Sequence, residues 1–80
     1  MAQYRKKPVI IEAIVFDGNN YKECKDFLEG NYDNTINYPN IKTLNGVVSV
    51  EVGELLCKGI NGEFYPCKPD IFEKTYEQVI

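Results

Sequence analysis

The side chains best suited to covalent chemistry in this sequence are its three cysteines, Cys24, Cys57 and Cys67. Cys24 lies on the apolar side of a predicted helix and Cys57 in a predicted strand, where a thiol usually packs as a small buried hydrophobe. Cys67 neighbours Lys68 and precedes a predicted helix start, a setting in which thiols can be reactive. A catalytic thiol also needs a proton acceptor, and the chain has no histidine. We therefore predict no catalytic residue and a protein that is not an enzyme.

Other patterns that hold ligands or nucleophiles are missing from the sequence. The single serine, Ser49, lies in the middle of a predicted strand, and no glycine-rich phosphate loop is present. The cysteines have no CxxC spacing, and no aspartate-rich loop has the rhythm of a calcium site. The sequence therefore predicts no metal site and no cofactor.

The basic residues are distributed more unevenly than the acidic ones. Three of the nine lie together at residues 5–7, which leaves six basic against twelve acidic residues in the rest of the chain. Basic and aromatic side chains together can hold a phosphate or nucleotide. A candidate pocket for a phosphate-bearing small molecule consists of Arg5, Lys7, Lys58, Tyr65 and Lys68. The alternative is that residues 5–7 are a solvated leader that protects the first strand from edge pairing.

Length and composition limit the class of protein. With 80 residues the chain supports one small domain, residues 1–80, with a single core. A net charge of −3 argues against general nucleic-acid binding, which depends on neutralising phosphates. No run approaches the roughly 20 apolar residues of a membrane helix. An odd number of cysteines is typical of reduced thiols, so we expect a cytoplasmic protein without a membrane partner.

The first half of the chain predicts a strand, a helix and a loop. Residues 8–16 are rich in β-branched side chains and nearly all apolar, which favours a central strand. Glu12 interrupts this run, and we expect it to face solvent or to form an ion pair with a lysine. Apolar spacing of helical period predicts a helix over about 20–29, with Asn19 or Asn20 as its cap. Residues 31–39 have no periodicity and are interpreted as a loop.

The second half predicts strands joined by tight turns. Asn-Gly pairs at 45–46 and 61–62, with Gly53-Glu54 between them, separate four short apolar segments. These segments predict a four-stranded antiparallel meander, with Pro66 at a sheet edge or bulge. Pro69 and Asp70 then begin a short helix over about 70–75. The predicted fold is therefore a small α+β domain, in which the N-terminal strand joins the meander in one antiparallel or mixed sheet.

The two ends of the chain resemble a family of small bacteriophage and prophage proteins. Residues 4–13 match a YRKKPVxxEA-like motif, and residues 58–77 match a KGxxGExYPxKPxxFExTYE-like motif. The family tends to have Pro-Gly-Asp before the fourth strand of the meander, where this chain has Val-Gly-Glu at 52–54. The resemblance implies a phage origin and therefore a location in the cytoplasm of a bacterial host. It does not indicate a biochemical activity.

Two hypotheses of function follow. The first is a non-enzymatic phage accessory protein that binds a phosphate-bearing small molecule through the pocket above. The second is a protein-interaction module that inhibits or redirects a host protein, through Tyr32 and Tyr38 of loop 31–39 or through an uncovered sheet edge. Because burial and chain entropy nearly cancel in so small a domain, homodimerisation is a natural source of extra stability.

Overall fold

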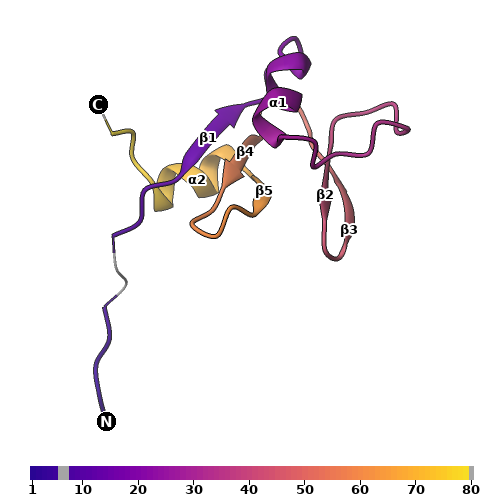
Figure 1. The fold of residues 1–80 in the computed structure, drawn as a ribbon. Coiled ribbons are helices and arrows are strands. Elements are labelled where there is room, and N and C mark those ends of the chain that lie inside the picture. Colours follow the sequence, from indigo (N-terminus) through magenta and orange to yellow (C-terminus); the bar gives the residue numbers. More distant parts are fainter. Residues whose placement is uncertain (6–7, 80) are drawn as a thin grey trace.

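A computed structural model describes residues 1–5 and 8–79, and this part of the chain forms five short strands and two helices (Figure 1). In chain order they are β1 (Glu12–Val15), α1 (Tyr21–Leu28), β2 (Asn40–Thr43), β3 (Gly46–Ser49), β4 (Leu55–Lys58), β5 (Phe64–Cys67) and α2 (Pro69–Thr75). The predicted α+β class is confirmed. Both helices begin and end within a residue of the predicted bounds.

The strands divide into two antiparallel sheets. β1, β4 and β5 form a three-stranded sheet in that order, and β2 and β3 form a separate hairpin. The first strand therefore lies beside the last hairpin, as expected. Its predicted central position is wrong, because β4 lies in the middle and its residues Leu55, Leu56 and Cys57 are all buried. β1 is an edge strand, and Val15 on it is 48% exposed.

The predicted continuous meander is interrupted between β3 and β4. Val50 turns into the core, where it is 5% exposed, and its N–H donates to the carbonyl oxygen of Pro39 at 2.8 Å. The following residues form a turn closed by a bond from the N–H of Glu54 to the carbonyl oxygen of Glu51. Gly53, at φ 95°, donates to the carbonyl oxygen of Phe16. The link after β3 is therefore bonded to the end of β1, and β3 has no ladder with β4.

The core lies between α1, one face of the three-stranded sheet and the base of the hairpin. α1 contributes Cys24 and Leu28, and the sheet contributes Leu56 and Phe64. The ring of Phe27 meets that of Phe64 edge to face, with centroids 5.6 Å apart. The hairpin adds Ile41, the residue after it adds Val50, and the residue after β1 adds Phe16. Full burial of each such side chain contributes about 1.5–3 kcal/mol.

The turn before α1 corrects the predicted helix cap. Asn20 is the N-cap residue, but its side chain makes no capping bond. Its amide nitrogen donates instead to the carbonyl oxygen of Val15 at 2.7 Å, and its amide oxygen accepts from the N–H of Asp17 at 2.9 Å. The side-chain amide of Asn20 thus bonds Val15 of β1 and Asp17 just after it. A peptide group of a neighbouring strand would make the same two bonds.

Pro66 confirms the predicted edge position. The N–H of Gly59 donates to the carbonyl oxygen of Glu63 at 2.8 Å. This bond establishes which residue pairs of the β4–β5 ladder are hydrogen-bonded, because bonded and non-bonded pairs alternate along an antiparallel ladder. Pro66 is paired with Leu56, a register position whose backbone groups point away from β4. The missing N–H of Pro66 therefore lies at the outer edge of β5, where no ladder bond is lost.

Candidate interaction surfaces

The structure places Lys58, the central lysine of the predicted phosphate pocket, on the α1 side of the sheet. Its ammonium nitrogen lies 3.2 Å from a carboxylate oxygen of Glu29, just after α1, and 5.7 Å from the ring centroid of Phe64. Tyr65 follows Phe64 in β5, so its side chain leaves the opposite face. Two members of the predicted pocket are therefore separated by the sheet itself.

The remaining described members of the predicted pocket lie on different elements. Tyr65 lies on the α2 side, where burial and a hydrogen bond to Tyr76 raise the pKa of its phenol. Lys68 is exposed at the start of α2, and Arg5 is exposed in the N-terminal segment, which leads away from the sheet in Figure 1. Lys7 lies outside the described residues. Among the four described members, the fold forms no common cradle for a phosphate.

Glu12 is exposed on β1, in agreement with one of the two expectations for it. Lys58 is its direct cross-strand neighbour, yet the ion pair of Lys58 is with Glu29. Glu29 is well exposed and Lys58 is one-third exposed, so the pair lies at the surface and contributes about 0–1 kcal/mol.

The cysteines confirm the predicted packing of Cys24 and Cys57. Both are buried, and all three cysteines are free thiols. Burial raises the pKa of the Cys24 thiol, and it raises that of Cys57 to about 11. Cys67 is half-buried, with its sulfur 3.6 Å from the carbonyl oxygen of Lys68. Neither buried thiol has the setting of a nucleophile.

Loop 31–39 is irregular, as predicted, but its two tyrosines differ. Tyr32 packs against the core and has the ammonium group of Lys25 5.4 Å from its ring centroid. Tyr38 is 50% exposed. The side chain of Asn40, which is 1% exposed, holds the loop by bonding the backbone of Asp33 and Tyr38. Only Tyr38 is thus available for a contact with another molecule.

The outer edge of β1 carries backbone groups that no other strand bonds. The N–H of Phe16 donates towards β4, to the carbonyl oxygen of Glu54 at 2.9 Å, so Ile14 and Glu12 face β4 as well. Ala13 and Val15 therefore direct their backbone groups outward. Asn20 bonds the carbonyl oxygen of Val15 and covers that end of the edge. The section from Ala13 back towards Ile11 stays uncovered by any strand of the described chain.

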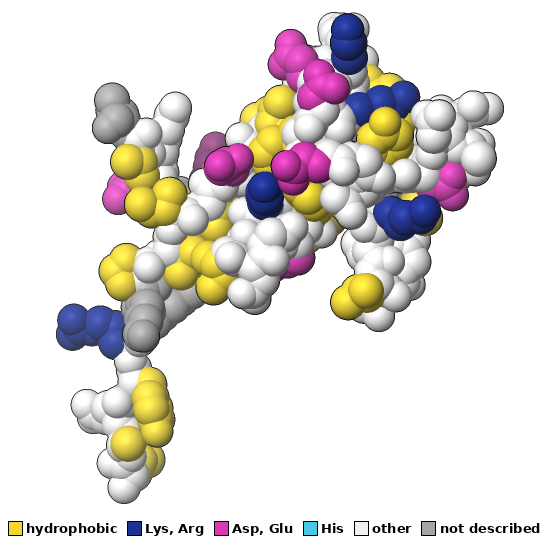
Figure 2. Space-filling view, viewed as in Figure 1, with side chains coloured by type: hydrophobic (Ala, Val, Ile, Leu, Met, Phe, Trp, Pro, Cys, Tyr) yellow, Lys and Arg dark blue, Asp and Glu magenta, His cyan; other side chains and the backbone are white. Residues whose placement is uncertain are grey.

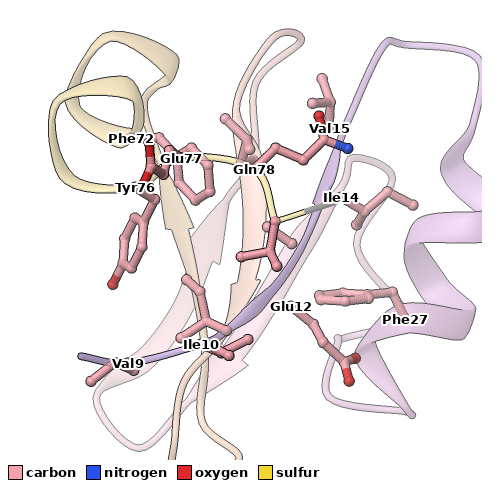
Figure 3. A pocket seen from close by; sticks show the side chains of 14 residues that line it. Val9, Ile10, Glu12, Ile14, Val15, Phe27, Phe72, Tyr76, Glu77 and Gln78 are labelled. Atoms are coloured by element: carbon pink, nitrogen blue, oxygen red, sulfur yellow. The ribbon is translucent and has the colours of Figure 1, made fainter.

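An apolar groove of about 820 Å³ surrounds this edge. Figure 3 shows Phe72 of α2 and Tyr76, which follows α2, on one side of β1 and Phe27 of α1 on the other. Val9, Ile10 and Ile11 extend the groove along the chain before β1, and Val79 adds to it from the C-terminal segment. Ile10 is 80% exposed and Val79 is 72% exposed. The sequence signal for this surface was the long apolar run 8–16, which exceeds what β4 can pair.

A second apolar surface lies on the hairpin. We define the hairpin surface as Leu44, Val47 and Val48, which are 106%, 39% and 38% exposed. Val47 and Val48 leave opposite faces of the hairpin, and Val48 shares the face of its cross-strand partner Ile41. All four residues of β3 are exposed, and Leu44 lies in the turn that joins the two strands. Figure 2 shows a hydrophobic side chain at the projecting end of this region. The Asn-Gly turn was evident in the sequence, whereas the exposure of its neighbours was not.

Among residues 1–5 and 8–79, no three acidic, cysteine or histidine side chains lie close enough together to hold a metal ion. Neither helix of this part of the chain has the length and apolar character needed to cross a bilayer. No family model, curated protein or solved structure matches the chain. The resemblance of its two ends to a phage family therefore stays a prediction from the motifs.

Proposed function

We propose that this chain is a non-enzymatic accessory protein that acts by binding another protein through its hairpin surface. The observation that carries the proposal is Leu44, a large apolar side chain that is completely exposed at the end of a projecting hairpin. Exposed apolar groups that gather on one element are typical of interaction sites. The partner that fits offers an apolar recess into which this side chain can insert.

The fold supports this proposal over the phosphate hypothesis. Lys58 is already paired with Glu29, and Tyr65 lies on the opposite face of the sheet. The hairpin, in contrast, contributes Ile41 to the core, and Leu44 in its turn is free of any packing role. The exposure of Leu44 therefore has no explanation in the stability of the domain, whereas Val47 and Val48 are more than half covered.

The compartment and the origin belong to the same proposal. The motif resemblance and the free thiols support a phage-encoded protein that works in the cytoplasm of a bacterial host. The partner is then a protein of the host cytoplasm, and the chain inhibits or redirects this protein.

The test is affinity capture from a bacterial lysate with the wild-type chain, Leu44→Lys and Ile71→Lys. Ile71 is 53% exposed on α2, so its variant adds the same charge at an exposed apolar position outside the hairpin. We expect one dominant protein to bind the wild type and Ile71→Lys, and its affinity for Leu44→Lys to fall at least about tenfold, as for a central apolar anchor. Equal capture by all three chains contradicts the proposal.

A further inference from the structure

We infer that the outer edge of β1 is occupied by β1 of a second copy of this chain, in an antiparallel pair centred on Ile11. In this register Val9 of each copy lies opposite Ala13 of the other. The inference concerns a different surface from the hairpin, so it stands or falls separately from the proposed function. Its evidence is the exposed area of the chain, the shape of the β1 edge and the distribution of charge.

The chain exposes more surface than a folded monomer of its mass. Its solvent-accessible surface is 6577 Å², whereas a compact protein of 9.2 kDa exposes about 4,900 Å². Its radius of gyration is 14.1 Å, against about 12 Å for a compact chain of 80 residues. Part of this excess belongs to the N-terminal segment, which leads away from the sheet (Figure 1). A stable interface needs about 800 Å² from each partner.

The uncovered apolar residues lie where the second copy would bind. Ile10 and Val15 belong to the edge and its continuation, and Val79 lines the groove around it. In Figure 2 hydrophobic side chains are visible along the region where Figure 1 places β1. An exposed apolar edge is a template for another strand. A second β1 supplies both the missing backbone partners and apolar side chains for the groove.

The register follows from three features of the edge. Asn20 already bonds the carbonyl oxygen of Val15, so the pairing must end at Ala13. A two-fold axis at Glu12 would place two carboxylates opposite each other, which is unfavourable. An axis at Ile11 instead pairs Ile11 with its own copy and Glu12 with Ile10 of the second chain. Residues 9–13 of one copy then pair with residues 13–9 of the other, and Asn20 of each copy limits one end of the paired segment.

Charge favours the same arrangement. Antiparallel pairing carries the N-terminal segment of each copy, with the exposed Arg5, towards Asp17 of the other. Residues 5–7 hold three of the nine basic residues of the chain, whereas the rest of the chain has an excess of acidic residues. A parallel pair would instead place the two basic N-terminal segments beside each other and would lack this complementarity.

The test measures mass in solution by light scattering and sedimentation for the wild type, Ile11→Lys, Ile11→Glu and an equimolar mixture of the two variants. We expect a wild-type dimer and two monomeric variants, because the axis places like charges opposite each other. The mixture should form a heterodimer, because the two charges then attract. Val48→Lys adds a lysine at an exposed hairpin position and should stay a dimer. Circular dichroism of each variant establishes that it is folded.

Each outcome decides a separate point. A wild type that is monomeric up to its solubility limit overturns the inference, as do dimeric Ile11 variants. Monomeric variants that fail to associate when mixed overturn the register centred on Ile11. If Ile11→Lys itself fails to fold, Ala13→Pro replaces it, because the N–H of Ala13 points outward and Ala13→Val is its matched control. Loss of the dimer with capture by the hairpin intact leaves the proposed function standing.

Discussion

At the scale of single residues, Glu29 is the clearest case of a position under conformational strain. It ends α1 in the left-handed region, at φ 53°, where a side chain crowds the following carbonyl. The sequence predicts a helix end near Gly30, and the structure places the first left-handed residue one position earlier. The carboxylate of Glu29 gains only an exposed ion pair with Lys58 in return.

This strain predicts an ordering of two variants. Glu29→Gly and Glu29→Ala both remove the ion pair, but only glycine adopts the left-handed conformation without a steric cost. We expect Glu29→Gly to be more stable than Glu29→Ala by about 1 kcal/mol. Urea unfolding followed by circular dichroism measures the difference. Equal midpoints would mean that the helix end relaxes freely out of this conformation.

At the scale of elements, a buried amide bonds loop 31–39 at two points, in addition to the packing of Tyr32 against the core. The side-chain oxygen of Asn40 accepts from the N–H of Asp33 at 2.7 Å, and its nitrogen donates to the carbonyl oxygens of Asp33 and Tyr38. Asn40 is also the first residue of β2, so it joins the loop to the hairpin. A long loop without regular structure is thereby held against the domain.

Removal of this amide should therefore destabilise the protein. Asn40→Ala leaves three backbone groups without their partner, and we expect it to lower the free energy of unfolding by about 2–3 kcal/mol. Asn37→Ala, an exposed asparagine of the same loop, should change it by less than about 0.5 kcal/mol. Chemical denaturation of the two variants makes the comparison. If both variants have the same stability, the loop is held by other contacts.

The elements also show how far the sequence predicts this molecule. Periodicity and turn residues were sufficient for both helices, all five strands and the burial of Cys24 and Cys57. The pairing of the strands was less predictable, because the burial of Val50, which separates β3 from β4, depends on contacts far away in the chain. The separation of two residues of the candidate pocket has a simpler reason. Lys58 and Tyr65 are close in sequence, but the alternation of β4 and β5 places them on opposite faces.

At the scale of the whole molecule, the thiols report the integrity of the fold. Cys24 and Cys57 are 2% and 0% exposed, and Cys67 is half-buried. We expect an aromatic disulfide reagent to modify one thiol in the native protein and all three in denaturant. Mass spectrometry of the labelled peptides should identify Cys67 as the first to react. Fast labelling of Cys57 in the native state would contradict the described packing of β4.

Cys57 also predicts a loss of stability at alkaline pH. Its pKa is raised from 9.0 to about 11 in the folded chain, because burial disfavours the thiolate. Between these values the unfolded chain releases a proton that the folded chain retains, so stability is complete below pH 9 and falls as the pH rises. Cys57→Ala should therefore lose less stability than the wild type between neutral pH and about pH 10. Parallel urea titrations test this, and identical losses would contradict it.

The two proposed surfaces together describe a bivalent molecule. Figure 1 shows the hairpin on the opposite side of the molecule from the N-terminal segment that leads into β1. A pair joined at β1 would therefore present its two hairpin surfaces outward, one from each copy. Two linked sites raise the apparent affinity for a dimeric or clustered partner without any new contact.

Pro66 has a consequence for the size of such an assembly. Joining two copies at β1 makes a six-stranded sheet whose outermost strands are both β5. Each outer edge then presents a proline, which has no N–H to offer a further strand. Growth of this sheet by strand addition stops at two chains, so the apolar edge of β1 is used in a closed pair and does not lead to open-ended polymerisation of the sheet.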